Sequence, residues 1–217
     1  MKSSVKECSV YFRGFVLLVV TGILFLLVAG KTVSFLSLNG YHSFWLNIFF
    51  IYYTFAGNGL FAVCLIAFYF FVLRRKQQGF ALLYSFIISG LIVVIIKDIF
   101  PAPRPGLFFE HSQQTFFIKG ITLHGNNSFP SGHTATAFAI ATVVVMMAHN
   151  KKLQLFVLFA AALVAYSRIY LSQHFLGDVL AGAVIGVTCG IASVWLAKKP
   201  LRINFFNVFK HAEMKAT

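Results

Sequence analysis

The sequence predicts an all-α, polytopic membrane protein with six transmembrane helices in a single domain, residues 1–217. Hydrophobic residues make up 59% of the chain and the mean hydropathy is +0.83. These values exclude an ordinary soluble domain and indicate that lipid is the main solvent. The charged residues lie in short runs between apolar stretches. Those runs separate six apolar segments, residues 14–30, 56–73, 79–96, 134–148, 153–166 and 179–197.

The first segment, residues 14–30, follows three basic residues, as the hydrophobic part of a signal peptide would. It is long for a signal peptide, and no clean small-residue cleavage site follows it, so we expect a retained first span. Residues 31–55 are expected as a non-cytoplasmic loop. Their many aromatic side chains fit an interfacial amphipathic segment or an aromatic belt, with a platform for a lipid substrate as the alternative.

The second and third segments, residues 56–73 and 79–96, are separated by a basic run and are predicted as the next two spans. The fourth and fifth are shorter than the ~20 residues that a spanning helix usually needs, so their helices are expected to extend into the flanking residues. Only residues 149–152 join these two segments, which predicts a helical hairpin. The sixth segment makes the number of spans even, so both termini are expected on one side.

The basic residues predict the orientation, because cytoplasmic loops carry an excess of lysine and arginine. Thirteen of the 18 lysines and arginines lie at the N-terminus, in the second and fourth connections, and from residue 198 onward. Both termini and the tail 198–217 are therefore expected in the cytoplasm. Residues 31–55 and 107–129 are expected as loops on the opposite side. The net charge of +13 is thus mainly a topology signal, and nucleic acid is not expected as a partner.

The three cysteines, Cys8, Cys64 and Cys189, are scattered and show no metal-ligand spacing. They are interpreted as small apolar packing residues. Neither a disulfide framework nor a metal site is expected, and no cofactor is predicted.

Three short clusters between the apolar segments share one chemistry. Besides Asp98, they supply three cations, two imidazoles and one carboxylate, and such groups are costly near a membrane unless they pair with one another or with a charged ligand. The excess of cations predicts an anionic ligand, for which phosphate fits best. The clusters are residues 97–105, residues 130–133, and Ser167-Arg168 with His174 and Asp178.

Three basic side chains provide the predicted phosphate contacts. Arg104 and Arg168 carry planar guanidinium groups suited to bidentate contacts, and Lys97 adds a point charge. Prolines around Arg104 stiffen its segment. Taken singly, Lys97 and Arg104 would be interpreted as side chains that snorkel to the interface. The complete set favours a phosphate site.

Residues 130–133 predict the start of the fourth helix. Pro130 before the helix, Ser131 at the cap position and the small Gly132 leave backbone N–H groups free, and such a helix end binds anions. We expect Ser131 and Gly132 to contact phosphate oxygens, with capping by Ser131 as a compatible role. His133 is then expected to face the leaving group as the general acid.

His174 and Asp178 are four residues apart and would share a face on a helix. A carboxylate that accepts from one imidazole nitrogen leaves the other as a base or nucleophile. Because no cysteine lies nearby, His174 is assigned as the nucleophile that forms a phosphohistidine. Asp178 is assigned as its partner, and a role in capping the sixth helix is compatible.

In order and spacing, the clusters resemble the three-part signature of the type-2 phosphatidic acid phosphatase superfamily. Its members include membrane lipid phosphate phosphatases, soluble acid phosphatases and vanadium haloperoxidases, and six spans agree with the membrane branch. The resemblance covers residues 97–178 with no signature residue missing. It implies metal-independent hydrolysis through a phosphohistidine. It also implies His133, His174 and Asp178 as the catalytic residues and a phosphate pocket of Lys97, Arg104, Ser131, Gly132, Ser167 and Arg168.

The resemblance further implies hydrolysis of a lipid phosphate or diphosphate at the outer face of a bacterial inner membrane. Undecaprenyl diphosphate, phosphatidylglycerol phosphate, phosphatidic acid and the lipid A phosphates are the expected candidates, and membrane lipids are the other expected partners. A lipid phosphotransferase would use the same residues with a lipid hydroxyl as acceptor. A vanadate-dependent peroxidase would share the anion pocket, but six spans argue against it. A lipid-binding or transport protein that uses the cationic pocket is the non-enzymatic alternative. The pair of His174 with Asp178 and the second histidine, His133, argue against it, because binding alone needs neither a nucleophile nor an acid.

Overall fold

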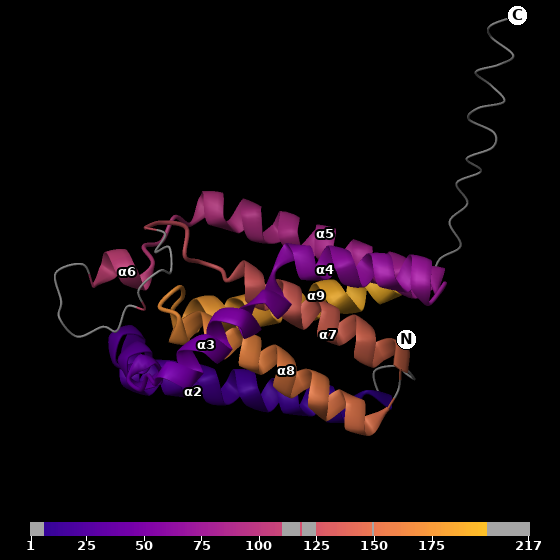
Figure 1. The fold of residues 1–217 in the computed structure, drawn as a ribbon. Coiled ribbons are helices and arrows are strands. Elements are labelled where there is room, and N and C mark those ends of the chain that lie inside the picture. The colour runs from indigo at the N-terminus through magenta and orange to yellow at the C-terminus, as the bar shows by residue number, and fades with distance from the viewer. Residues whose placement is uncertain (1–6, 110–117, 119–124, 149, 199–217) are drawn as a thin grey trace, which may run out of the picture.

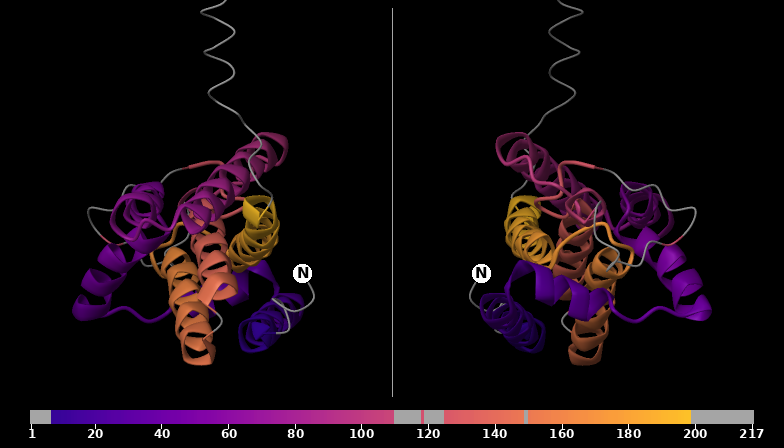
Figure 2. Two further views of the ribbon diagram at one scale, coloured as in Figure 1. Left: turned by 90° about the vertical axis from the view of Figure 1, so that its right-hand side faces the viewer. Right: turned by 90° about the vertical axis from the view of Figure 1, so that its left-hand side faces the viewer.

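The computed structural model describes residues 7–109, 118, 125–148 and 150–198, and the regular elements in this part are all helical. The long helices lie side by side in a bundle (Figures 1 and 2). They are α2 (Ser9–Asn39), α5 (Lys76–Ile99), α7 (Gly132–Ala148), α8 (Lys151–Tyr170) and α9 (Leu176–Lys198). The shorter ones are α3 (Phe44–Tyr53), η1 (Thr54–Gly57), α4 (Gly59–Ala67), η2 (Phe68–Val72) and α6 (Pro105–Phe108). The all-α prediction is confirmed. The tail from residue 199 and most of the predicted loop 107–129 lie outside the described residues.

Four helices in the described part, α2, α5, α8 and α9, are long and apolar enough to cross a membrane. The consecutive elements from α3 to η2 make a fifth candidate if they count as one span, although they bend by 56°. The expected fourth span, residues 134–148, is the body of α7, which has 17 residues and falls short of that length. The structure therefore supports four or five spans where the sequence predicted six. A sixth span is thus not confirmed, because α7 is too short; this helix packs against α5, α8 and α9, and most of its residues are buried.

The outward faces of the helices are strongly apolar. Leu27 and Val28 on α2 are 74% and 88% exposed, and Phe71 near the end of η2 is 80% exposed. A soluble protein rarely exposes a continuous surface of this kind, because the apolar area would contact water. The surface is that of helices solvated by lipid, as the composition predicted.

Residues 31–55, predicted as a loop, are mostly helical. Residues 31–39 continue α2, and α3 follows after a short turn in which Ser43 Oγ accepts a hydrogen bond from Leu46 N (3.4 Å). Asn58 Oδ1 accepts from Leu60 N (2.9 Å) and so caps α4. Aromatic residues are enriched at membrane interfaces, but they also form apolar helix faces, so their number did not distinguish a loop from a helix.

Helix α2 is kinked at Gly30, whose φ of 73° and ψ of 171° are far from helical values. This region of backbone conformation is open almost solely to glycine, because a Cβ atom would clash with the local backbone. A Cβ placed on Gly30 would meet no other part of the chain within 4 Å. The requirement for glycine is therefore conformational and not a matter of space.

Close contact between α7 and α9 forms the centre of the bundle. Gly182, Gly186 and Gly190 line the face of α9 that packs on α7, and a Cβ on Gly186 would lie 2.4 Å from the Ala135 carbonyl oxygen. Small residues at such spacing let helix backbones approach closely in membranes, where dispersion contacts replace the hydrophobic effect as the driving force. The two helices that carry the second and third clusters are thus held at a fixed separation.

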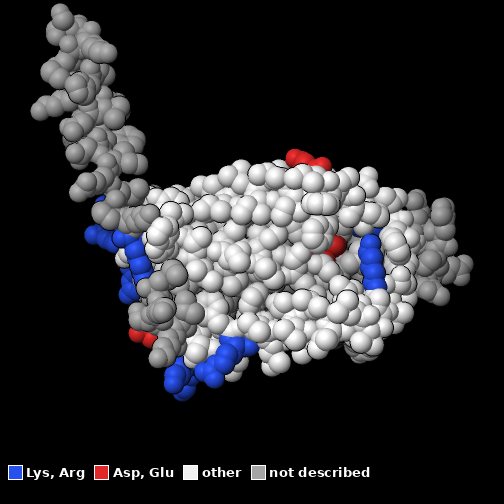
Figure 3. All heavy atoms as spheres, turned by 180° about the vertical axis from the view of Figure 1, so that it is seen from behind, with Lys and Arg blue, Asp and Glu red and all other residues white. Residues whose placement is uncertain are grey.

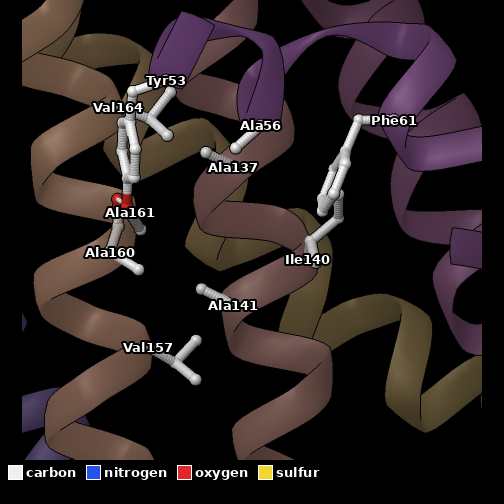
Figure 4. A pocket seen from close by; sticks show the side chains of 10 residues that line it. All are labelled: Tyr53, Ala56, Phe61, Ala137, Ile140, Ala141, Val157, Ala160, Ala161 and Val164. Atoms are coloured by element: carbon white, nitrogen blue, oxygen red, sulfur yellow. Dashed lines mark hydrogen bonds between the residues drawn. The ribbon is translucent and has the colours of Figure 1, made fainter. Parts of the chain in front are cut away.

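A small apolar cavity of about 100 Å³ lies between α7, α8 and the η1–α4 segment. Figure 4 shows that alanine side chains line much of it, with Tyr53 and Phe61 at its sides. The Tyr53 hydroxyl donates to the Ala160 carbonyl (3.1 Å), which satisfies its polar group. This cavity is therefore an apolar space whose described lining residues offer no free polar group that could bind a ligand or take part in a reaction.

The two ends of the bundle differ in charge. Helices α2, α5 and α8 begin, and α9 ends, at the same end of the molecule (Figure 1). Most of the lysines and arginines visible in the space-filling view gather at that end (Figure 3). The three predicted clusters lie at the opposite end, where α5 terminates and α7 begins.

Candidate active site

The three clusters meet where α5 ends, α7 begins and α8 passes into α9. Ser128 N donates to the Ala102 carbonyl (2.9 Å), which holds the loop after α5 against the segment before α7. Ser131 N donates to the Asp178 carbonyl (3.0 Å), which joins the start of α7 to the start of α9. Backbone hydrogen bonds thus join pairs of residues that are 26 and 47 positions apart in the sequence.

His174 lies in the turn between α8 and α9 and is 2% exposed. Its Nδ1 is 3.5 Å from Asp178 Oδ2, and the same carboxylate oxygen accepts from Ser128 Oγ and from Phe175 N (3.0 Å). The predicted pairing is present, but the expected shared helical face is wrong, because α9 begins only at Leu176. Asp178 instead reaches back to the backbone before the helix, as the acidic member of a capping box does.

The surroundings of His174 favour its neutral form. Burial lowers the pKa of this imidazole, and the Asp178 carboxylate opposes that shift. A neutral ring with its proton on Nδ1 donates to Asp178 and leaves the lone pair on Nε2 open. This arrangement is suited to a nucleophile.

Helix α7 begins at Gly132, directly after Ser131, as the capping pattern predicted. Ser131 Oγ accepts from Thr134 N (3.4 Å) and from Thr134 Oγ1 (2.9 Å), so the capping role is present. The Ser131 N–H is already donated to Asp178 and is not open to a ligand. The N–H groups that a phosphate could use belong to Gly132 and His133 in the first turn.

His133 occupies the first turn of α7, the helix outside the candidate spans. Burial lowers the pKa of its imidazole to about 3, and the nearby Arg168, His174, Arg104 and Lys97 contribute in the same direction. Without an anion the ring is neutral. A bound phosphate would offset the positive charges and favour the protonated form that a general acid needs.

Arg168 is buried near the end of α8 with an incomplete set of partners. Its Nη1 donates to Thr54 Oγ1 in η1 (2.8 Å). Its Nε is also buried and has no hydrogen-bond partner in the part of the chain that the structure describes. A buried guanidinium group with an unpaired N–H is costly unless an anion accepts from it. The arginine therefore indicates where a ligand oxygen would lie.

Arg104 and Lys97 are held by the segment that precedes Ser128. Arg104 Nη1 donates to Gln173 Oε1 (3.0 Å) and its Nε to the Asn126 carbonyl (3.2 Å). Lys97 Nζ donates to the Asn127 carbonyl. Burial lowers the pKa of the Arg104 guanidinium, because the charged group is only partly solvated by water.

Ser167, the remaining predicted pocket residue, is fully buried and donates its hydroxyl to the Val164 carbonyl in its own helix (2.6 Å). Three further residues that sequence reasoning missed contact the site residues, namely Thr54, Ser128 and Gln173. Gln173 adjoins His174 and Ser128 precedes the second cluster, so their positions offered a signal. Thr54 lies in the segment expected as a loop, where no signal marked it.

Comparison with known proteins identifies relatives along most of the chain. The family profile of the PAP2 superfamily matches residues 78–202. A lipid A 4'-phosphatase of Porphyromonas gingivalis is 30% identical over 166 residues, 72% of this chain and 68% of that protein. The undecaprenyl-diphosphatase BcrC of Bacillus subtilis is 32% identical over 104 residues, 48% of this chain and 50% of that protein.

Two solved structures share the fold. The crystal structure of Aquifex aeolicus LpxE has a TM-score of 0.65 and 30% sequence identity, and the match covers 76% of this chain and 94% of that one. A PAP2-type phosphatidylglycerolphosphate phosphatase from Bacillus subtilis has a TM-score of 0.64 over 91% of this chain and 99% of that one. Its 22% identity supports the fold alone.

Proposed function

The chain belongs to the PAP2 superfamily and is a membrane lipid phosphatase, and from this premise we propose that it hydrolyses a lipid phosphate or diphosphate through a phosphohistidine at His174. The observation that carries the proposal is the buried group of His174, Asp178 and Ser128 near Arg168, whose Nε has no partner within the described ranges of the chain. These contacts support a nucleophile with an orienting carboxylate near a guanidinium group whose buried Nε–H has no acceptor among the described residues.

In the first step, the phosphate of the substrate accepts from Arg168, Arg104, Lys97 and the first-turn N–H groups of α7. His174 Nε2 attacks phosphorus as the bond from phosphorus to the lipid oxygen breaks. His133 donates its proton to that leaving oxygen, which becomes a lipid hydroxyl or a lipid monophosphate. Asp178 stabilises the positive charge that develops on His174.

In the second step, water attacks the phosphohistidine and His133 accepts a proton from the water. The N–P bond breaks, inorganic phosphate is released and His174 returns to its neutral form. No metal takes part in this scheme. Ser131 Oγ accepts from Thr134 at the start of α7, which leaves its own hydroxyl proton for the predicted contact with a phosphate oxygen, and Ser167 Oγ donates within α8 and supports the pocket from there.

The proposed orientation places the site on the non-cytoplasmic side of a bacterial inner membrane, with both termini in the cytoplasm. The gathering of basic residues at the end of the bundle opposite the site supports this orientation. The proposed substrates are undecaprenyl diphosphate, phosphatidylglycerol phosphate, phosphatidic acid and lipid A phosphates; the names of relatives support the first and the last of these.

The test is phosphate release by the detergent-purified protein from a panel of these lipids, with EDTA present. His174→Ala is run in parallel, with Cys64→Ala, an exposed cysteine on α4, as the control. Release from one lipid class that survives EDTA, persists in the control and is lost in His174→Ala would support the proposal. An acid-labile phosphoryl group on wild-type protein would identify the intermediate. Absence of release from every lipid by folded protein would contradict hydrolysis and favour transfer or binding.

A further inference from the structure

A large apolar groove of about 910 Å³ adjoins the candidate active site. Leu26 of α2, Phe100 after α5, and Phe129 and Phe175 from the site loops contribute apolar walls. Among the lining residues the charged ones are Asp178 and Lys31. Figure 3 shows this face of the molecule, which is hollowed towards the site end, with acidic and basic atoms beside the hollow.

The groove and the reaction centre share a wall. Asp178 lines the groove and pairs with His174, and Phe175, another lining residue, directly follows His174 in the chain. Because the groove is apolar and lies between helices that face lipid, the hydrocarbon chain of the substrate can occupy it while the phosphate reaches His174. The part of the substrate next to the broken bond then passes along the inner end of the groove.

Lys31 is held at this position. Its Nζ lies 4.0 Å from the centre of the Phe175 ring and 4.6 Å from that of Phe108, which are cation–π contacts. The non-helical Gly30 immediately precedes it and redirects α2 at this point. The Lys31 ammonium group therefore lies over Phe175, the residue next to the proposed nucleophile. The Lys31 side chain is nevertheless exposed, so that a ligand can reach it.

We propose that Lys31 binds a second phosphate, the one that stays on the lipid when the terminal phosphate is removed, so that the preferred substrate is a lipid diphosphate. The proposal rests on the function proposed above. In a diphosphate, the retained phosphate is one bridging oxygen away from the phosphorus that His174 attacks. It is the negative group of the lipid nearest to that phosphorus, and an exposed cation in the groove that takes the lipid chain can bind it.

The alternative without a specific binding role is that Lys31 only extends its ammonium group to the membrane interface. Such a lysine would affect all lipid substrates alike, because its contacts would be with the bulk membrane. A lysine that binds the retained phosphate affects diphosphates selectively. The difference between diphosphate and monophosphate ligands therefore decides between the two.

The experiment measures binding without turnover, in the His174→Ala protein, so that it does not depend on hydrolysis. Dissociation constants for farnesyl diphosphate and farnesyl monophosphate are compared with and without Lys31→Met, with Lys31→Arg to restore the charge. Lys152→Met at the start of α8, at the opposite end of the bundle, is the matched control. We expect Lys31→Met to weaken diphosphate binding about tenfold and monophosphate binding less than twofold, as the loss of one charge-assisted contact predicts.

Partial recovery in Lys31→Arg and no selective change in Lys152→Met complete the expected pattern. Equal weakening of both ligands, or no change in either, would overturn the role of Lys31. Selective weakening in a protein whose wild type releases no phosphate would retain the second phosphate site and contradict only the hydrolytic function.

Discussion

Ser128 offers a sharp test of the proposed nucleophile, because it contacts the site without contacting the phosphate pocket. Its hydroxyl donates to Asp178 Oδ2 and lies 3.4 Å from His174 Nδ1. Ser128→Ala removes one of the groups that hold the carboxylate, while the Phe175 N–H and the imidazole remain. The expected loss is that of one hydrogen bond to a charged group, about 1.5–2 kcal/mol.

If this loss falls on the transition state, kcat decreases roughly 10- to 30-fold. KM should change little, because Arg168, Arg104 and Lys97 keep their contacts. The assay is steady-state phosphate release in detergent micelles from the lipid that the wild-type protein hydrolyses fastest. This pattern would show that Ser128 acts through the orientation of Asp178 and His174.

Ser193→Ala provides the matched control. Ser193 is also fully buried, and its hydroxyl donates to the Cys189 carbonyl in α9, away from the site. It should retain kcat within about twofold, since a hydrogen bond to the serine's own helix contributes little. Wild-type kcat in Ser128→Ala, or the same decrease in both variants, would refute the reasoning.

Three further predictions follow from the site and its supports. Gln173→Leu removes the acceptor for Arg104 Nη1 and should raise KM about tenfold with kcat nearly unchanged. Gln173→Glu keeps an acceptor and should restore KM. A decrease in kcat alone would argue against a role of Gln173 in positioning Arg104. Inorganic phosphate should bind with uptake of a proton, because the anion raises the pKa of His133 from its lowered value of about 3, so binding should tighten as the pH falls. Calorimetry in two buffers of different ionisation enthalpy measures this uptake, and His133→Asn should lose it. Gly186→Ala should lower the unfolding free energy by about 2 kcal/mol, because its Cβ would lie 2.4 Å from the Ala135 carbonyl oxygen and the backbones cannot separate freely. Thermal unfolding in detergent compares Gly186→Ala with Gly90→Ala, whose added Cβ would meet nothing within 4 Å. Equal stability of the two variants would contradict the close packing of α7 on α9.

Much of the site was predictable because its chemistry is local in sequence. The start of α7 at Gly132 followed from a proline, a capping serine and a glycine in succession. The extension of α8 through Arg168 followed from an apolar segment too short to span by itself. The pairing of His174 with Asp178 also followed from their spacing, although the helix that was expected to carry both begins two residues after the histidine.

The positions of Thr54 and Lys31 could not be predicted in the same way. Thr54 contacts Arg168 across more than 100 residues, and its segment was expected as a loop because it connects the first two predicted spans. Lys31 looks like any interfacial lysine until the kink at Gly30 places it over Phe175. Both depend on contacts between distant elements, which leave no periodic or compositional mark.

By itself the sequence determined the solvent, the helical class and the family, and it predicted the residues of the phosphate chemistry, because hydropathy, caps and short motifs depend on residues that are close together in the chain. The tertiary structure decided how many helices have the length to span a membrane. It also decided which N–H groups at α7 remain open, which residues orient the arginines, and where the apolar groove meets the site. These properties arise from packing, since burial and the pairing of polar groups are settled only when distant helices come into contact.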